Sequence, residues 1–266
     1  MNYFDHDKYN VLVTGANGHL GESLSKGFAT MGANVFLNGR DKKKIFKLVE
    51  KFEKKNFKVK PAVFDINNYT QVKNFFNKNK KFHTIVNNAF STKLNHYDFF
   101  EKKRFNNAFD IGITSVANIM KEAEKNLIKG AKENGTASII NILSMYASVS
   151  PDPSLYDGYN FRSSPHNPPH YGAAKAGLLH FSKIAAVNLA KRKVRVNCIS
   201  PGPFPNIKNN FLKLDQKFLK RLKNKNPMGR YGKPDELITT ALYLSSKNSS
   251  FITGANIPVD GGWTLW

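Results

Sequence analysis

The sequence predicts an α/β protein built on one doubly wound parallel sheet with helices on both faces. Short apolar runs, typical of buried parallel strands, alternate with amphipathic helical segments along the 266 residues. A glycine-rich turn follows the first apolar run and leads into a helical segment. No linker of distinct composition interrupts this alternation, so we expect a single domain over residues 1–266.

Composition narrows the possible classes of function. The formal net charge of +22 makes nucleic-acid binding an alternative to consider. However, the lysines are spread over several segments and no nucleic-acid-binding motif occurs, so solvated helix faces are the simpler interpretation. A basic surface of this kind could also steer anionic substrates toward the protein.

Cysteine and histidine usage bounds the compartment and the metal chemistry. Cys198 is the only cysteine, which excludes an internal disulfide and is typical of a reducing cytosol. No run approaches secretory or membrane-spanning length, so we expect a cytoplasmic protein outside the membrane. His83, His96 and His180 are scattered, and no metal-ligand spacing occurs, so we expect no metal site.

The first strand is expected at residues 9–14, and the helix after it closes at Gly32. The turn between them contains Gly15, Gly18 and Gly21. Glycine at such a turn lets a pyrophosphate approach the backbone and bind at the positive end of the helix. The alternative is a tight turn that needs glycine only for packing.

A second strand, at residues 33–38, leads to Gly39, Arg40 and a lysine-rich helix. The residue at the end of this strand usually meets the adenosine ribose of a dinucleotide. An acidic side chain there would accept a hydrogen bond from a free 2′-hydroxyl, whereas arginine favours a 2′-phosphate. Arg40 therefore favours NADP, with NAD and an ordinary exposed charge as alternatives. A third strand, at residues 59–64, ends at Asp65, which could accept a hydrogen bond from adenine or cap the next helix.

Polar side chains follow two of the remaining strands. These strands are expected at residues 84–89, 137–143, 193–199 and after residue 254. The remaining helices are expected at residues 69–80, 105–126, 171–188 and within 206–226. Asn87 and Asn88 end one strand and can line a crevice or only cap the turn. Ser144 stands at the carboxyl end of another, where ligands bind in open parallel sheets.

An active-site flap is expected at about residues 146–170, which have no helical or strand periodicity. Its polar aromatic residues, including Tyr156 and Tyr159, suit a ligand rich in hydroxyl groups. A surface insertion is the alternative.

Tyr171 and Lys175 follow this segment and lie one helical turn apart on one face of the predicted helix. A free tyrosine has a pKa of about 10, and a neighbouring cation stabilises the phenolate and lowers that pKa. The pair could therefore exchange a proton with a substrate. The alternative is that both residues merely lie on an amphipathic helix.

Together these motifs resemble the short-chain dehydrogenase/reductase family over about residues 9–263. The resemblance is carried, in the family's order, by residues 14–21, Asp65, residues 87–89, Ser144, Tyr171, Lys175, residues 194–202 and residues 252–262. It implies a Rossmann-type fold, a nicotinamide cofactor, hydride transfer to or from an alcohol or carbonyl, and a homotetramer or dimer. Tyr171 would be the general acid and base, Lys175 would hold the ribose and lower the tyrosine pKa, and Ser144 would hydrogen-bond the reacting oxygen.

The resemblance also places the remaining contacts of the site. The expected cofactor-binding positions are Gly15, Asn17, Gly18, His19, Leu20, Gly21, Arg40, Asp65, Ile66, Asn88, Ala89, Tyr171, Lys175, Pro201, Gly202 and Phe204. The expected substrate-contacting positions are Ser144, Met145, Tyr146, Tyr156 and Tyr159.

Four departures from the family pattern are expected to matter. The turn has glycine at Gly18, one residue before the usual place, which His19 occupies. Phe90 replaces a glycine and narrows the space near the cofactor. Gly112 stands where an asparagine commonly supports a water relay, so we expect a perturbed relay. The threonine often found after Pro201 and Gly202 is absent, which removes a common anchor for the carboxamide.

The inserted flap is similar to that of a subgroup linked to flagellin modification and surface-glycan sugar biosynthesis. The leading hypothesis is an NADP-preferring oxidoreductase that acts on a hydroxyl or ketone of a small-molecule sugar or sugar derivative. A 3-oxoacyl carrier-protein reductase is the alternative within enzymes. A cofactor-binding scaffold or sensor that has lost turnover is the alternative from another class.

Overall fold

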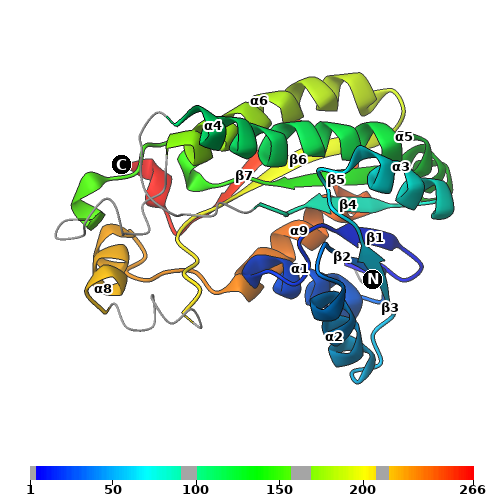
Figure 1. Cartoon of the computed structure of the whole chain (residues 1–266), viewed down its shortest axis with the longest axis horizontal. Coiled ribbons are helices and arrows are strands. Elements are labelled where there is room, and N and C mark those ends of the chain that lie inside the picture. Colours follow the sequence, from blue (N-terminus) through cyan, green and yellow to red (C-terminus); the bar gives the residue numbers. More distant parts are fainter. Residues whose placement is uncertain (1–3, 91–100, 157–168, 208–215) are drawn as a thin grey trace.

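The computed structural model describes residues 4–90, 101–156, 169–207 and 216–266, and its centre is one seven-stranded sheet. The strands run in the order β3-β2-β1-β4-β5-β6-β7, and every pairing between them is parallel. They comprise β1 Asn10–Val13, β2 Asn34–Gly39, β3 Val59–Val63, β4 Thr84–Asn87, β5 Ala137–Ile142, β6 Val194–Pro201 and β7 Asn256–Val259. Helices cover both faces of this sheet (Figure 1), which confirms the predicted fold class.

The strand order reverses at β1, which lies between β2 and β4. Val11 pairs with Val35 of β2 on one side and with Thr84 of β4 on the other. Apolar side chains of β1 are buried on both faces of the sheet, as its continuous apolar sequence predicts. A ligand crevice is expected at the carboxyl ends of strands on either side of such a reversal.

Each face of the sheet carries its own hydrophobic core. One face packs against α1 His19–Thr30, α2 Lys42–Glu53 and α9 Ile238–Ser245, through residues such as Leu24 and Ile45. The other packs against α3 Tyr69–Lys78, α5 Ser115–Asn134 and α6 Pro169–Ala190, through residues such as Val72 and Leu127. The helices α4 Lys102–Phe109 and α8 Gln216–Lys225 complete the set described. Cys198 of β6 lies in the second core, where burial raises the pKa of its thiol to about 11.

The segment predicted as one helix at residues 105–126 is divided into three pieces. Between α4 and α5 lies a π-helical turn, Asp110–Thr114, with Gly112 buried inside it. The hydroxyl of Thr114 donates to the carbonyl of Phe109 at 3.4 Å, which follows the wider spacing of this turn. The apolar periodicity of the sequence did not predict this turn, because a π-helical turn adds only one residue to the helix and hardly changes the spacing of its apolar residues.

The helix α9 was not predicted. It is only eight residues long and mostly apolar, so it lacks the polar face that marks an amphipathic helix. Leu242 and Leu244 are buried in the core shared with α1 and the sheet. Within the described ranges, no helix combines the length and hydrophobicity needed to cross a lipid bilayer.

Candidate active site

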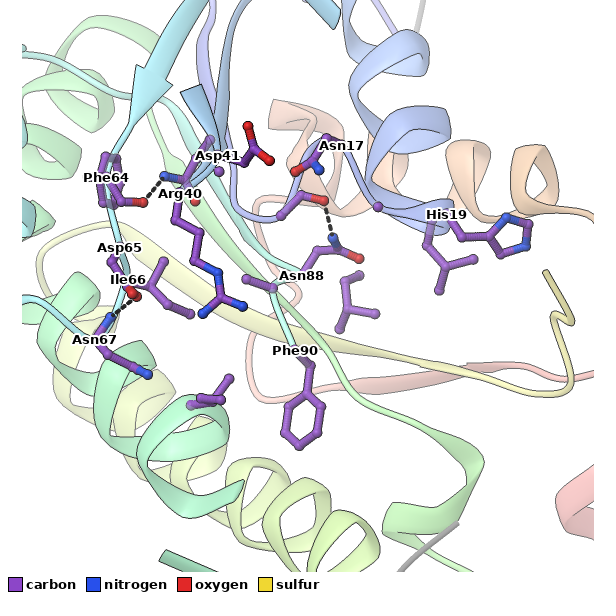
Figure 2. Close-up of a pocket in the computed structure, with 18 of the residues that line it drawn as sticks. Asn17, His19, Arg40, Asp41, Phe64, Asp65, Ile66, Asn67, Asn88 and Phe90 are labelled. Atoms are coloured by element: carbon purple, nitrogen blue, oxygen red, sulfur yellow. Dashed lines mark hydrogen bonds between the residues drawn. The ribbon is translucent and has the colours of Figure 1, made fainter. Parts of the chain in front are cut away.

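A pocket of about 800 Å³ opens at the carboxyl ends of the central strands. Its lining comes from the turns after β1 to β5, together with α2, the π-helical turn and α6. The lining residues are Gly15, Asn17, Gly18, His19, Leu20, Asn38, Gly39, Arg40, Asp41, Lys44, Phe64, Asp65, Ile66, Asn67, Asn88, Ala89, Phe90, Ile111, Ile142, Leu143, Tyr171 and Lys175. Figure 2 shows that Arg40, Asp65, Asn88 and His19 come to this space from separate segments.

The glycine turn after β1 is required by both conformation and packing. Gly15 has a φ of 62°, and a Cβ there would lie 2.9 Å from the Cα of Ala89. A Cβ at Gly21 would lie 2.2 Å from the carbonyl oxygen of Gly15. Gly18 precedes the first residue of α1 and provides no side-chain cap, and the positive end of the helix lies at the pocket, where it can bind an anion. The turn therefore fits a pyrophosphate.

Thr14 and Asn88 hold the turn against the end of β4. The Asn88 amide donates to the carbonyl oxygens of Thr14 at 2.9 Å and Gly15 at 3.2 Å. In return, the hydroxyl oxygen of Thr14 accepts from the backbone N–H groups of Asn88 and Ala89, each at 3.0 Å. Asn88 thus positions the turn as well as lining the pocket. Thr14 was not among the expected site residues, because in the sequence it only ends the apolar run of the first strand.

Two cations stand at the end of the pocket beside β2. Arg40 follows that strand and Lys44 lies in the first turn of α2, both exposed and both lining the pocket. Gly39 leaves room for its neighbours, because a Cβ there would lie 2.8 Å from the side-chain oxygen of Asn17 and from the Cδ1 of Ile45 unless they moved. The two positive side chains fit a phosphate group.

Asp65 lines the same end, next to Ile66 and Asn67. Its carboxylate accepts from the backbone N–H of Asn67 at 3.0 Å and so shapes the turn after β3. The cap of α3 is Asn68, which accepts from the N–H of Gln71. Asp65 is therefore not the helix cap, and it stays available to line the pocket.

Tyr171 and Lys175 occupy the other end of the pocket, at the start of α6. The Lys175 Nζ lies 5.8 Å from the centroid of the Tyr171 ring and donates to the backbone carbonyl of Ile142 at 2.7 Å. Burial lowers the pKa of this amine to about 7. Ser144 comes to the same place from the end of β5 and hydrogen-bonds Tyr171.

Burial raises the pKa of Tyr171, and the hydrogen bond from Ser144 lowers it by less. This direction is opposite to the one expected from a phenol beside a cation. The reason is that burial removes the phenolate from water, and this penalty outweighs the effect of the Ser144 hydrogen bond. A lowered Tyr171 pKa stays a prediction for the protein with its cofactor bound.

Several expected contacts lie away from the pocket lining. A Cβ at Gly202 would meet the Cα of Asp260 at 2.5 Å, and Phe204 packs against Gly232, so both serve the packing between segments. Pro201 ends β6 outside the lining. Gly21 likewise serves packing, since its neighbour is the backbone of the turn.

Three of the expected substrate-contacting residues belong to a hydrophobic cluster against which Tyr171 packs. Met145, Tyr146 and Tyr156 are buried with Phe218, Leu219, Leu222, Leu155 and Trp263. The rings of Tyr156 and Phe218 lie 5.8 Å apart. An ion pair of 2.5 Å between Asp152 and Lys225 ties the same segment to α8. Tyr159 lies outside the described residues, as do residues 157–168 of the segment expected to form a flap.

The sequence did not identify several lining residues. Lys44, Phe64, Asn67, Ile111 and Leu143 join the pocket through the sheet order, and no local motif marks them. Their common signal is position, because each stands within a few residues of a strand end or helix start. In the described part of the chain, no group of three or more His, Cys, Asp or Glu residues could hold a metal ion.

Comparison with known proteins extends over nearly the whole chain. A family model described as enoyl-(acyl carrier protein) reductase matches residues 15–264. Gluconate 5-dehydrogenase of Gluconobacter oxydans is 28% identical over 259 residues, which cover 96% of this chain and 94% of that protein. A 3-oxoacyl-[acyl-carrier-protein] reductase of Chlamydia muridarum is 30% identical over an alignment 266 residues long, and this alignment covers 95% of this chain and 96% of that protein.

A solved structure shows the same likeness in three dimensions. It is a gluconate 5-dehydrogenase from Burkholderia cenocepacia in complex with NADP and tartrate. The two folds agree with a TM-score of 0.86 at 26% identity, and the match covers 100% of this chain and 98% of that one.

Proposed function

Because this chain belongs to the short-chain dehydrogenase/reductase family, we propose that it transfers a hydride between NADP and a hydroxyl or ketone of a sugar or sugar derivative. Membership in the family makes it an NAD(P)-dependent oxidoreductase. One observation carries the finer proposal. A single pocket has Tyr171 and Lys175 at one end and the cations Arg40 and Lys44 at the other.

The residues of the pocket fit a dinucleotide along its length. The N-terminus of α1 and the backbone at Gly18 would hold the pyrophosphate. Arg40 and Lys44 would bind a 2′-phosphate, which supports NADP over NAD. The NADP complex of the Burkholderia relative agrees with this choice.

At the reaction end, the bound nicotinamide supplies or accepts the hydride. The hydroxyl of Tyr171 would exchange a proton with the substrate oxygen, because it reaches the pocket there while the Lys175 amine is held by the carbonyl of Ile142. Ser144, which hydrogen-bonds Tyr171, would hold the same oxygen in place. The Lys175 amine would bind ribose hydroxyls and, when charged, favour the phenolate of Tyr171.

Two kinds of relative support different substrates. The gluconate 5-dehydrogenases support a sugar or sugar acid, and the Chlamydia relative supports a 3-oxoacyl thioester as the second candidate. A role in flagellin modification or surface-glycan synthesis rests on the similarity of the segment before Tyr171 and is the most specific part of the proposal.

A substrate panel tests these alternatives directly. We would follow NADPH consumption with keto-sugars and keto-sugar acids, and with acetoacetyl-CoA as a thioester probe. Turnover of a sugar supports the proposal, whereas turnover of the thioester alone moves the assignment to the second candidate. Tight NADPH binding without turnover of any substrate would instead favour the scaffold or sensor.

We also propose that the protein assembles as a homo-oligomer in the cytoplasm. The apolar side chains of Phe251, Leu265 and Trp266 are exposed near the C-terminus, and β7 is the last strand of the sheet. Exposed apolar side chains of this size are often covered in a subunit contact. Light scattering coupled to size-exclusion chromatography would give the number of subunits, and a monomer at micromolar concentration would contradict the proposal.

A further inference from the structure

The ring of Phe90 lies against both Lys175 and Tyr171. Its centroid is 4.7 Å from the Lys175 Nζ, which is within the range of a cation–π contact. The Phe90 and Tyr171 ring centroids are 5.1 Å apart, with the planes at 81°, an edge-to-face arrangement. Figure 2 shows the Phe90 side chain projecting from the segment that carries Asn88. Phe90 therefore contacts Tyr171 and Lys175 from the segment after β4, whereas those two residues belong to α6.

Gly112 makes room for this ring. A Cβ at position 112 would lie 3.0 Å from Cε2 of Phe90 and 3.3 Å from the Cβ of Ala174. The φ of Gly112 is not in the left-handed region, so its backbone conformation does not demand glycine. A methyl group at position 112 would instead require the Phe90 ring to shift by a few tenths of an ångström. Bulk at position 90 and its absence at position 112 are therefore sterically matched.

The ring also completes the surroundings of the Lys175 amine. That side chain is only 4% exposed, and its Nζ donates to the carbonyl of Ile142 at 2.7 Å. The titratable groups that face it are Tyr171 on its own helix and Cys198 on β6. On the side of the π-helical turn, the Phe90 ring covers the amine, and Gly112 packs against that ring.

We propose that Phe90, accommodated by Gly112, is a positioning residue that holds the Lys175 amine beside Tyr171 and keeps water from it. The proposal rests on the proposed function, since it concerns the same proton transfer. It assigns a joint role to the two residues that depart most from the family pattern around the reaction end. Neither residue needs to touch the substrate to act in this way.

A double-mutant cycle tests the match between the two positions. Gly112→Ala alone is expected to lower kcat about tenfold with little change in KM, because the added methyl displaces the ring from Lys175. In a Phe90→Ala background, the same Gly112→Ala change is expected to alter kcat less than about twofold. Phe109→Ala removes an exposed ring from the adjacent end of α4 and serves as the control, with unchanged kinetics.

A second measurement does not depend on turnover. Phe90→Ala admits water to the amine, which stabilises its charged form and raises the Lys175 pKa from about 7. The pH at which NADPH affinity is half lost, measured by NADPH fluorescence, is expected to rise by about one unit. A ring that only fills space would change the affinity without moving this pH.

Additive effects on kcat, or an unmoved pH midpoint in Phe90→Ala, would overturn the proposal. If Gly112→Ala does not fold, as judged by its melting curve, the pH midpoint of Phe90→Ala decides alone. Tyr171→Phe separates this proposal from the proposed function. Full turnover in that variant would defeat the proton-transfer role of Tyr171, whereas the pH midpoint of NADPH binding would still report on Phe90 and Lys175.

Discussion

Lys175 donates from Nζ to the backbone carbonyl oxygen of Ile142 across 2.7 Å. This contact ties a buried amine to the end of β5 through a neutral acceptor, which compensates less for lost hydration than a carboxylate would. The low pKa of Lys175, about 7, follows from that environment. The cofactor-free protein therefore carries a destabilising charge at its reaction centre near neutral pH.

Lys175→Met is expected to stabilise the cofactor-free protein near pH 7, by up to about 4 kcal/mol. The folded-state pKa lies below the unfolded value, so the amine favours unfolding when protonated. This penalty is complete below about pH 7 and disappears as pH rises toward about 10. Urea unfolding of both proteins at several pH values measures the difference, which should shrink with rising pH. A difference independent of pH would contradict the burial of a titrating amine.

Tyr171→Phe is expected to lower kcat by about 10²- to 10⁴-fold, because it removes the hydroxyl that exchanges the proton. The ring contact with Phe90 is retained, so NADPH binding should change little. Stopped-flow measurement of NADPH oxidation and fluorescence titration of NADPH separate the two effects. An equal loss of binding and turnover would point to a structural role for the hydroxyl.

Arg40→Ala and Lys44→Ala are each expected to raise the Kd for NADPH about tenfold and to leave that for NADH within about twofold. Both side chains line the pocket beside β2, where a 2′-phosphate is the group that NADH lacks. Lys47→Ala is the matched control, since Lys47 is exposed on the same helix outside the pocket lining. Equal weakening of both cofactors would argue against a 2′-phosphate site.

Thr14→Val is expected to destabilise the protein by about 2 kcal/mol, because the N–H groups of Asn88 and Ala89 lose a shared acceptor. Thr14→Ser retains the hydroxyl and should restore most of that stability. Chemical denaturation measures the change, and NADPH affinity should fall in parallel because the same bonds hold the glycine turn. Wild-type affinity in a clearly destabilised Thr14→Val protein would separate the turn from cofactor binding.

The strands and most helices could be predicted because their causes are local. The apolar run before Gly15 and the amphipathic pattern after it specify β1 and α1 without reference to the rest of the chain. The helix α9 and the π-helical turn at Gly112 escaped prediction for the opposite reason. An apolar helix is recognised by what it packs against, and a π turn follows contacts that periodicity does not record.

The site divides in the same way. The sequence by itself determined that Tyr171 and Lys175 share a helix face, because four residues make about one helical turn. Only the tertiary structure decided that Lys44 joins Arg40, that Thr14 holds Asn88, and that Phe90 meets Gly112. The Thr14–Asn88 contact joins segments far apart in the chain, because β1 pairs with β4 in the sheet. The other two contacts depend on how the chain turns after β2 and on how the π-helical turn packs against the end of β4. The tertiary structure also decided that the pKa of Tyr171 is raised, because burial of the side chain depends on the packing of the whole protein.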